Sequence, residues 1–213
     1  MASDAGPSRT AADWAVAGVA GPLPRGAARD AAWAVRTSPD SRVRAAALGA
    51  LVRRAGARRT RAAWRAAASD PDAGVRRRAA ELAPDLGDPP CGSLVSLLCD
   101  ADPLVADAAA WALGELGEAA RGAVGALCRL ATDHTDPLVR EAAVASLGAI
   151  GDPRGLPAIL TATTDKPAIR RRAVLALASF EGPDVDVALA RATEDRDWQV
   201  RDAVRALLEG QGG

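Results

Sequence analysis

A segment of about 31 residues recurs six times along the chain, and this internal repeat restricts the fold more than any other feature. Each copy places Val or Ile at an anchor position, usually with Arg directly after it. Successive anchors are 32, 30, 34, 30 and 31 residues apart. Repeats of such lengths form solenoids, in which each copy buries its apolar face against its neighbours. The anchors are Val43, Val75, Val105, Val139, Ile169 and Val200.

The residues after each anchor have the spacing of a buried helix face. Ala, Val or Leu stands four and eight positions after every anchor, and four copies also have an apolar residue at position eleven. This spacing is that of an amphipathic helix. A proline precedes the anchor in five copies, and proline is favoured in the first turn of a helix. We therefore predict one helix per anchor, called here the second helix of its repeat.

Shorter apolar segments lie between these helices and predict a first helix for each repeat. They are residues 62–68, 94–99, 124–130, 156–161 and 185–192. The core side chains are mostly Ala, Leu and Val, and alanine is the best helix former. We predict an all-α protein, a right-handed α-solenoid of about six helix pairs. A single solenoid is expected over residues 11–209, with flexible tails at 1–10 and 210–213.

Two stretches carry a family resemblance, DPLVREAAVASLGAIGD (Asp136–Asp152) and DKPAIRRRAVLALASFEG (Asp165–Gly182). They are similar to bacterial HEAT-like repeats of the phycobilisome-lyase type, and the resemblance extends over residues 23–209. It implies a helical solenoid and does not specify a function. The period is shorter than the general HEAT length of about 40–47 residues. The third copy also departs, because Ala106 stands where the others have arginine.

The arginine after each anchor predicts contacts between repeats. It can pair with an aspartate at the start of a neighbouring second helix, which would link successive copies. Other arginines are concentrated in the N-terminal half: residues 25–80 carry a charge of +10, although the whole chain is neutral. Clustered arginines can bind phosphates. The candidate basic patch is Arg53, Arg54, Arg58, Arg59, Arg61, Arg65, Arg76, Arg77 and Arg78.

Trp111 is the main candidate binding residue. It lies six residues after Val105, and at about 100° per residue this position points away from the buried face. The second helices of a solenoid line its concave surface, so Trp111 is expected there. Asp107 lies one turn earlier on the same face. Arg140, Glu141 and Arg171, from the next two repeats, complete the predicted binding surface. Trp33 and Trp64 occupy a mostly apolar position ahead of their anchors, and we expect both in the core.

The sequence offers no recognisable catalytic motif, so no cofactor or metal is predicted. His134 is the only histidine and lies in a polar loop. The cysteines Cys91, Cys99 and Cys128 do not form a CxxC pair, and Cys99 and Cys128 are expected in the core. A HEAT-like hydroxylase would, by resemblance, need several His-Glu pairs to hold two irons. Here His134 is followed by Thr135, so this activity is not expected. The expected location is the cytoplasm, without a membrane segment.

Three functions remain open at this point. The first is a protein-interaction scaffold that uses the concave surface. The second is nucleic-acid binding through the arginine-rich half, including a form similar to HEAT-like DNA-base glycosylases. The third is an enzyme or chromophore lyase with a small ligand in the concave groove, where Trp111 and Asp107 lie near Arg140 and Glu141.

Overall fold

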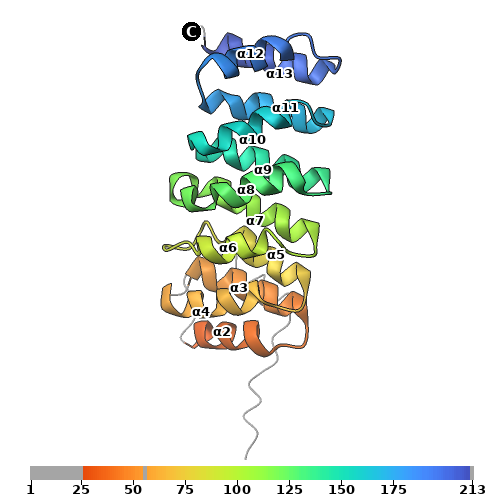
Figure 1. Cartoon of the computed structure of the whole chain (residues 1–213). Helices are drawn as coiled ribbons and strands as arrows, with labels where there is room; N and C mark the ends of the chain where they lie inside the picture. The colour runs from red at the N-terminus through yellow and green to blue at the C-terminus, as the bar shows by residue number, and fades with distance from the viewer. Residues whose placement is uncertain (1–25, 55–56, 212–213) are drawn as a thin grey trace, which may run out of the picture. The chain divides into compact units, whose positions relative to one another are not determined.

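The computed structural model describes residues 26–54 and 57–211, and the side chains within them except those of residues 54, 57–59, 210 and 211. This part of the chain contains twelve α-helices and no strand, which confirms the all-α prediction (Figure 1). The chain divides into two compact units, residues 1–93 and 94–213. Each unit is described by itself below.

The N-terminal unit consists of two helix pairs. The second helices α3 and α5 pack on one another, and the first helices α2 and α4 do the same. This produces two layers of helices, as expected when each repeat buries its apolar face against the next. The helices are α2 (Ala27–Thr37), α3 (Ser41–Arg54), α4 (Ala57–Ala68) and α5 (Ala73–Leu82), and α6 (Cys91–Leu97) follows.

The C-terminal unit repeats the same two-layered arrangement. Its second helices pack in the order α7, α9, α11 and α13, and its first helices in the order α8, α10 and α12 (Figure 1). They are α7 (Pro103–Glu115), α8 (Val124–Asp133), α9 (Pro137–Ile150), α10 (Leu156–Ala162), α11 (Pro167–Ala176), α12 (Pro183–Ala192) and α13 (Trp198–Gln211). Three short 3-10 helices complete the unit: η1 (Gly117–Ala123), η2 (Pro153–Gly155) and η3 (Leu177–Ser179).

The starts of the second helices follow from local sequence. Asp72, Asp102 and Asp136 each accept a hydrogen bond from a backbone N–H group in the first turn of α5, α7 and α9. Proline is the first residue of α7 and α9, where its missing N–H group costs nothing. The Asp-Pro signal therefore sets where these helices begin.

The core lies between the two layers, and the anchor residues are its common element. All six anchors are buried, as are the residues four positions after them. The second helices approach one another closely where small residues meet. At Gly148 an added Cβ atom would lie 2.6 Å from the Cβ atom of Ala176, so α9 and α11 could not pack this way with a larger residue.

Two predictions about core residues are corrected by the structure. Trp64 is buried, and its indole N–H donates to the carbonyl oxygen of Ala79 at 2.7 Å, which confirms its expected place. Trp33, however, is 58% exposed. The buried face of α2 is formed by its alanines and Val35, and Trp33 lies on the opposite side of the helix. Cys99 is also exposed rather than core, because it follows the end of α6.

Of the two predicted tails, only the C-terminal one, residues 210–213, overlaps the described residues. Helix α13 continues to Gln211, two residues beyond the predicted end of the repeat region at 209. The predicted tail at residues 1–10 lies outside the described residues.

Within the described residues, none of the helices combines the length and the apolar character needed to cross a bilayer.

Candidate functional site

A groove of about 350 Å³ opens on the second helices of the C-terminal unit, between α7 and α9. We call it the α7–α9 groove. Small residues of both helices line much of it, and small side chains leave room for a group from outside. Larger side chains stand beside them, Trp111 from α7 and Leu138 from α9. The small lining residues are Gly114, Ala142, Ala145, Ser146 and Ala149.

Trp111 is the largest apolar side chain of the groove. It is 47% exposed, because it lies six residues after the buried anchor Val105 and so points away from the core. Leu138 precedes the next anchor by one residue and is equally exposed. Exposing two large apolar side chains in one groove costs hydrophobic free energy that a bound partner would recover.

Carboxylates and one arginine surround this apolar centre. Asp107 and Glu115 come from α7, Glu141 from α9, and Arg172 from α11. Arg172 Nη2 lies 3.4 Å from Glu141 Oε1. Arg172 Nε is buried and has no hydrogen-bond partner within the described residues. A buried donor without an acceptor is unfavourable.

Arg140 and Arg171, which the sequence placed on the same surface, do not line the groove. Position one after an anchor turns toward the following repeat, whereas position three turns toward the preceding one. Arg140, at position one, therefore pairs forward with Asp165, and Arg172, at position three, pairs back with Glu141. The groove brings Trp111, Asp107 and Glu141 together, and Arg172 rather than the predicted Arg171 lies beside them.

Leu138, Glu115 and Arg172 were missed at the sequence level. A usable signal was present for Leu138. The position before the anchor and the position six after it are seven residues apart, so they share a helix face. Leu104 and Trp111 on α7 follow this spacing, as do Leu138 and Ala145 on α9.

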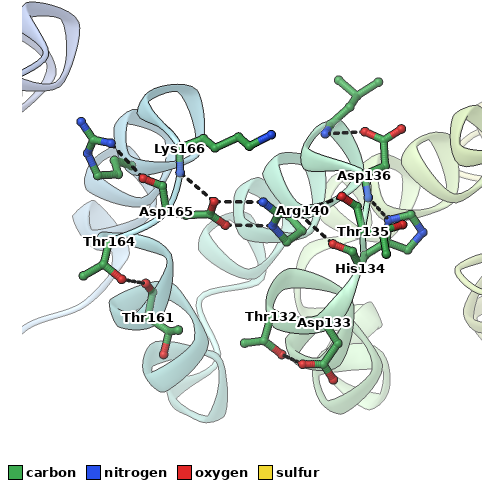
Figure 2. A network of polar contacts seen from close by, with 12 residues as sticks. Thr132, Asp133, His134, Thr135, Asp136, Arg140, Thr161, Thr164, Asp165 and Lys166 are labelled. Atoms are coloured by element: carbon green, nitrogen blue, oxygen red, sulfur yellow. Dashed lines mark hydrogen bonds and ion pairs between the residues drawn. The ribbon is translucent and has the colours of Figure 1, made fainter.

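The predicted links between repeats are confirmed in three copies. Arg140 Nε and Nη2 donate to the two carboxylate oxygens of Asp165 at 2.8 and 2.9 Å, while Nη1 donates to the carbonyl oxygen of His134 in its own loop (Figure 2). Arg44 with Asp70 and Arg170 with Asp195 repeat this bidentate geometry. The hydrogen bonds from the arginines lower the pKa values of Asp165 and Asp195. These arginines are therefore structural links.

The junction between α7 and α9 has neither the arginine nor the aspartate at the two positions that form this link in other copies. Ala106 is buried at the arginine position of α7. His134 lies five residues before Val139, where Asp70, Asp100 and Asp195 precede their own anchors. Its Nδ1 atom accepts the N–H group of Asp136, as the carboxylate of Asp195 does for Asp197 (Figure 2). His134 thus keeps the local role of the aspartate at a junction that has no arginine to bind.

The candidate basic patch is partly neutralised within its own unit. Arg77 and Arg78 both pair with Glu81, and Arg61 pairs with Asp88. Arg76 donates to backbone carbonyl groups of its own loop, those of Asp70 and Pro71. Arg53 and Arg65 are exposed. The side chains of Arg54, Arg58 and Arg59 lie outside the described residues.

Cys128, which the sequence placed in the core, is only partly buried. Burial raises the pKa of the Cys128 thiol, which disfavours the nucleophilic thiolate. No cluster of three His, Cys, Asp or Glu side chains suited to a metal ion occurs among the described residues.

The repeat geometry agrees with known proteins. A sequence profile of HEAT repeats matches residues 62–129, 93–166 and 126–209. This chain is a HEAT-repeat protein. This match confirms the resemblance to HEAT repeats that was inferred from the sequence. The repeats of this chain are about 31 residues long.

Solved structures support the fold of this HEAT-repeat protein. The Escherichia coli protein YibA is 15% identical, with a TM-score of 0.62, over 86% of this chain and 72% of YibA. Computationally designed armadillo repeat proteins for modular peptide recognition are 18% identical, with a TM-score of 0.55, over 84% of this chain and 98% of theirs. These two likenesses show the helical-repeat fold alone.

The CpcE–CpcF complex of phycocyanin lyase from Nostoc is 29% identical over 56% of this chain and 76% of that chain, with a TM-score of 0.43. No curated protein matches this sequence.

Proposed function

We propose that this HEAT-repeat protein is a protein-binding module, and that the α7–α9 groove receives an apolar side chain from an exposed segment of its partner. The observation that carries the proposal is the exposed indole of Trp111 beside a groove lined by small residues. Tryptophan is enriched among residues that dominate binding energy, particularly where neighbouring contacts exclude water.

The polar groups around the groove suit a peptide segment. The Arg172 side chain is 38% exposed, and its accessible N–H groups would donate to a backbone carbonyl group of the partner. Glu115 is exposed and could receive a basic side chain next to the apolar contact. The related designed armadillo proteins are described as made for modular peptide recognition, which is consistent with this use of a helical-repeat surface.

The proposal is tested with a display library of random linear peptides selected on the full chain. Selected peptides are then measured by fluorescence polarisation against the wild type and Trp111→Ala. We expect Trp111→Ala to weaken binding about fivefold or more, on the order of a hot-spot contact, while the melting temperature stays nearly unchanged.

Trp33→Ala is the matched control, because Trp33 is also an exposed tryptophan, at 58% against 47% for Trp111, and belongs to the N-terminal unit. It should leave peptide affinity unchanged. Selection of no peptide, or of peptides that bind Trp111→Ala as well as the wild type, would show that the groove is not the binding site.

The other two functions gain no support of comparable strength. The basic patch is partly paired with carboxylates of its own unit. The arginine that was to accompany Trp111 and Asp107 in a catalytic groove, Arg140, is held by Asp165.

A further inference from the structure

Trp111 stands between two acidic residues of its own helix. Asp107 precedes it by four residues and Glu115 follows it by four, and residues at this spacing lie on one face of a helix. All three side chains line the α7–α9 groove. The exposed indole therefore has a negatively charged residue one helical turn away on each side.

The lining of the groove carries an excess of negative charge. Its ionisable residues are Asp107, Glu115 and Glu141 against a single cation, Arg172. Arg172 lies 3.4 Å from Glu141, so these two charges largely compensate each other. Glu115 is exposed, and within the described part of the chain it belongs to no ion pair. A partner segment with a positive charge is therefore complementary to this groove.

An arginine side chain suits this combination of groups better than other side chains. A cation is attracted to the face of an aromatic ring, and the ring of tryptophan is the most favourable. The guanidinium group is planar, so it stacks on the ring while the N–H groups at its edge remain free to donate to a carboxylate. The ammonium group of lysine supplies the charge without the stacking surface.

We propose that the partner segment carries an arginine close to its apolar side chain, and that the guanidinium group stacks on Trp111 and donates to Glu115. The apolar side chain occupies the space over the small residues between α7 and α9. This inference rests on the proposed function, because it specifies the kind of segment that the groove receives. Glu115 is then the residue that selects for the arginine.

An acidic segment fits the same groove poorly. Arg172 is the single cation among the lining residues, and it is already held by Glu141. A carboxylate brought to the indole would approach Glu115, and like charges placed together weaken binding and exclude such partners.

The test selects two display libraries of random linear peptides on the full chain, one with all amino acids and one without arginine and lysine. Peptides from both are measured by fluorescence polarisation against the wild type and Trp111→Ala. We expect Trp111-dependent peptides from the complete library, with an arginine close to a large apolar residue. The other library should give none, or peptides that bind about tenfold more weakly, the order expected for a lost hydrogen bond between charged groups.

Variants of the tightest-binding peptide then test the contact itself. Citrulline in place of arginine keeps the planar shape but is neutral, so affinity should fall about tenfold. Lysine keeps the charge and should give an intermediate affinity. Glu115→Gln should weaken the arginine peptide several-fold and leave the citrulline peptide nearly unaffected. Glu194→Gln, the same change at an exposed position outside the groove, is the control and should bind both peptides as the wild type does.

The two libraries separate a failure of this inference from a failure of the proposed function. Trp111-dependent peptides of equal affinity from both libraries would leave the groove as a peptide site and overturn its recognition of arginine. If neither library gives Trp111-dependent peptides, both proposals fail. Equal affinity of the arginine and citrulline peptides, or an equal effect of Glu115→Gln on both, would also overturn the arginine contact. Circular dichroism of each protein variant verifies that the helices remain folded.

Discussion

The hydroxyl oxygen of Ser146 on α9 lies 2.6 Å from the carbonyl oxygen of Ala110 on α7. It also lies 2.8 Å from the carbonyl oxygen of Ala142, so its single proton is shared between two helices. Ser146 is buried beneath the α7–α9 groove, and a Cβ atom added at Gly114 would lie 3.1 Å from its Cα atom. The width of the groove therefore depends on this contact.

Enlarging Ser146 should separate the two helices. Ser146→Val removes the hydrogen bond, replaces the hydroxyl with a methyl group and adds a second methyl group close to Gly114 of α7. We therefore expect a loss of about 1–3 kcal/mol in the free energy of unfolding. Ser146→Ala removes only the hydrogen bond and should cost about 0.5–1.5 kcal/mol. Urea unfolding measures both. Equal stability of the two variants would show that α7 and α9 are not tightly packed here.

Leu147 tests the core of the central repeats. Its side chain is almost fully buried, eight residues after the anchor Val139. Leu147→Ala should cost about 2–5 kcal/mol, because the surrounding helices cannot collapse fully into the cavity. The exposed Leu138→Ala on the same helix is the control, and it should change stability by less than about 1 kcal/mol. A loss below half a kcal/mol for Leu147→Ala would contradict the assigned core face.

The links between repeats predict how stability depends on pH. The pKa values of Asp165 and Asp195 are lowered in the folded protein, chiefly by hydrogen bonds from Arg140 and Arg170. Hydrogen bonds from Arg154 lower the pKa of Asp152 to about 2. The pKa of an aspartate in the unfolded chain is about 3.9. When folding lowers this pKa, the charged carboxylate stabilises the protein at pH values above about 3.9. The stabilisation is lost as the pH falls through the lower pKa of the folded protein.

We therefore expect the urea midpoint to fall below about pH 4 in the wild type. Asp165→Asn should be less stable than the wild type at neutral pH and should show a shallower acid decline. Glu194→Gln, at an exposed position, is the control and should follow the wild-type curve. An identical pH profile for Asp165→Asn and the wild type would refute a stabilising role for this pair.

The junction between α7 and α9 predicts a coupled pair of substitutions. Ala106→Arg alone places a guanidinium group at a junction where His134 stands in the position of the aspartate. It should therefore strongly lower the free energy of unfolding. His134→Asp alone should be nearly neutral, because a carboxylate can accept the N–H group of Asp136 as Asp195 does for Asp197.

The double variant should recover part of the loss, with a coupling energy on the order of 0.5–3 kcal/mol. Urea unfolding of all four proteins completes the cycle. If the effects of the two substitutions on the free energy of unfolding simply add, α7 and α9 lie too close for the arginine link that other junctions contain.

The basic patch predicts weak nucleic-acid binding at most. Because Arg61, Arg77 and Arg78 are paired with carboxylates of the same unit, these three arginines are less available to replace phosphate counterions. We expect no gel shift of duplex or single-stranded DNA or RNA at physiological salt. A shift that weakens steeply with salt and disappears in Arg58→Ala/Arg59→Ala/Arg61→Ala would reverse this expectation.

The repeat fold was determined by the sequence itself. The anchor residues, the apolar positions four and eight residues later and the Asp-Pro helix starts are local signals, and helix periodicity fixes which side each one faces. That is why the exposed direction of Trp111 and the pairing of Arg140 with an aspartate of a neighbouring repeat could be inferred from spacing alone. The same periodicity could have indicated Leu138. It lies seven residues before Ala145, which occupies on α9 the position that Trp111 occupies on α7.

Other features depended on the tertiary structure, because they arise where different helices meet. Arg172 rather than Arg171 reaches Glu141 because only one of the two adjacent side chains turns toward α9. Trp33 is exposed and Trp64 buried although they precede their anchors by similar distances, since the packing of each first helix decides its inner face. The structure also decided which carboxylate each linking arginine reaches, because the sequence marks the position of an arginine but not the carboxylate that lies opposite it.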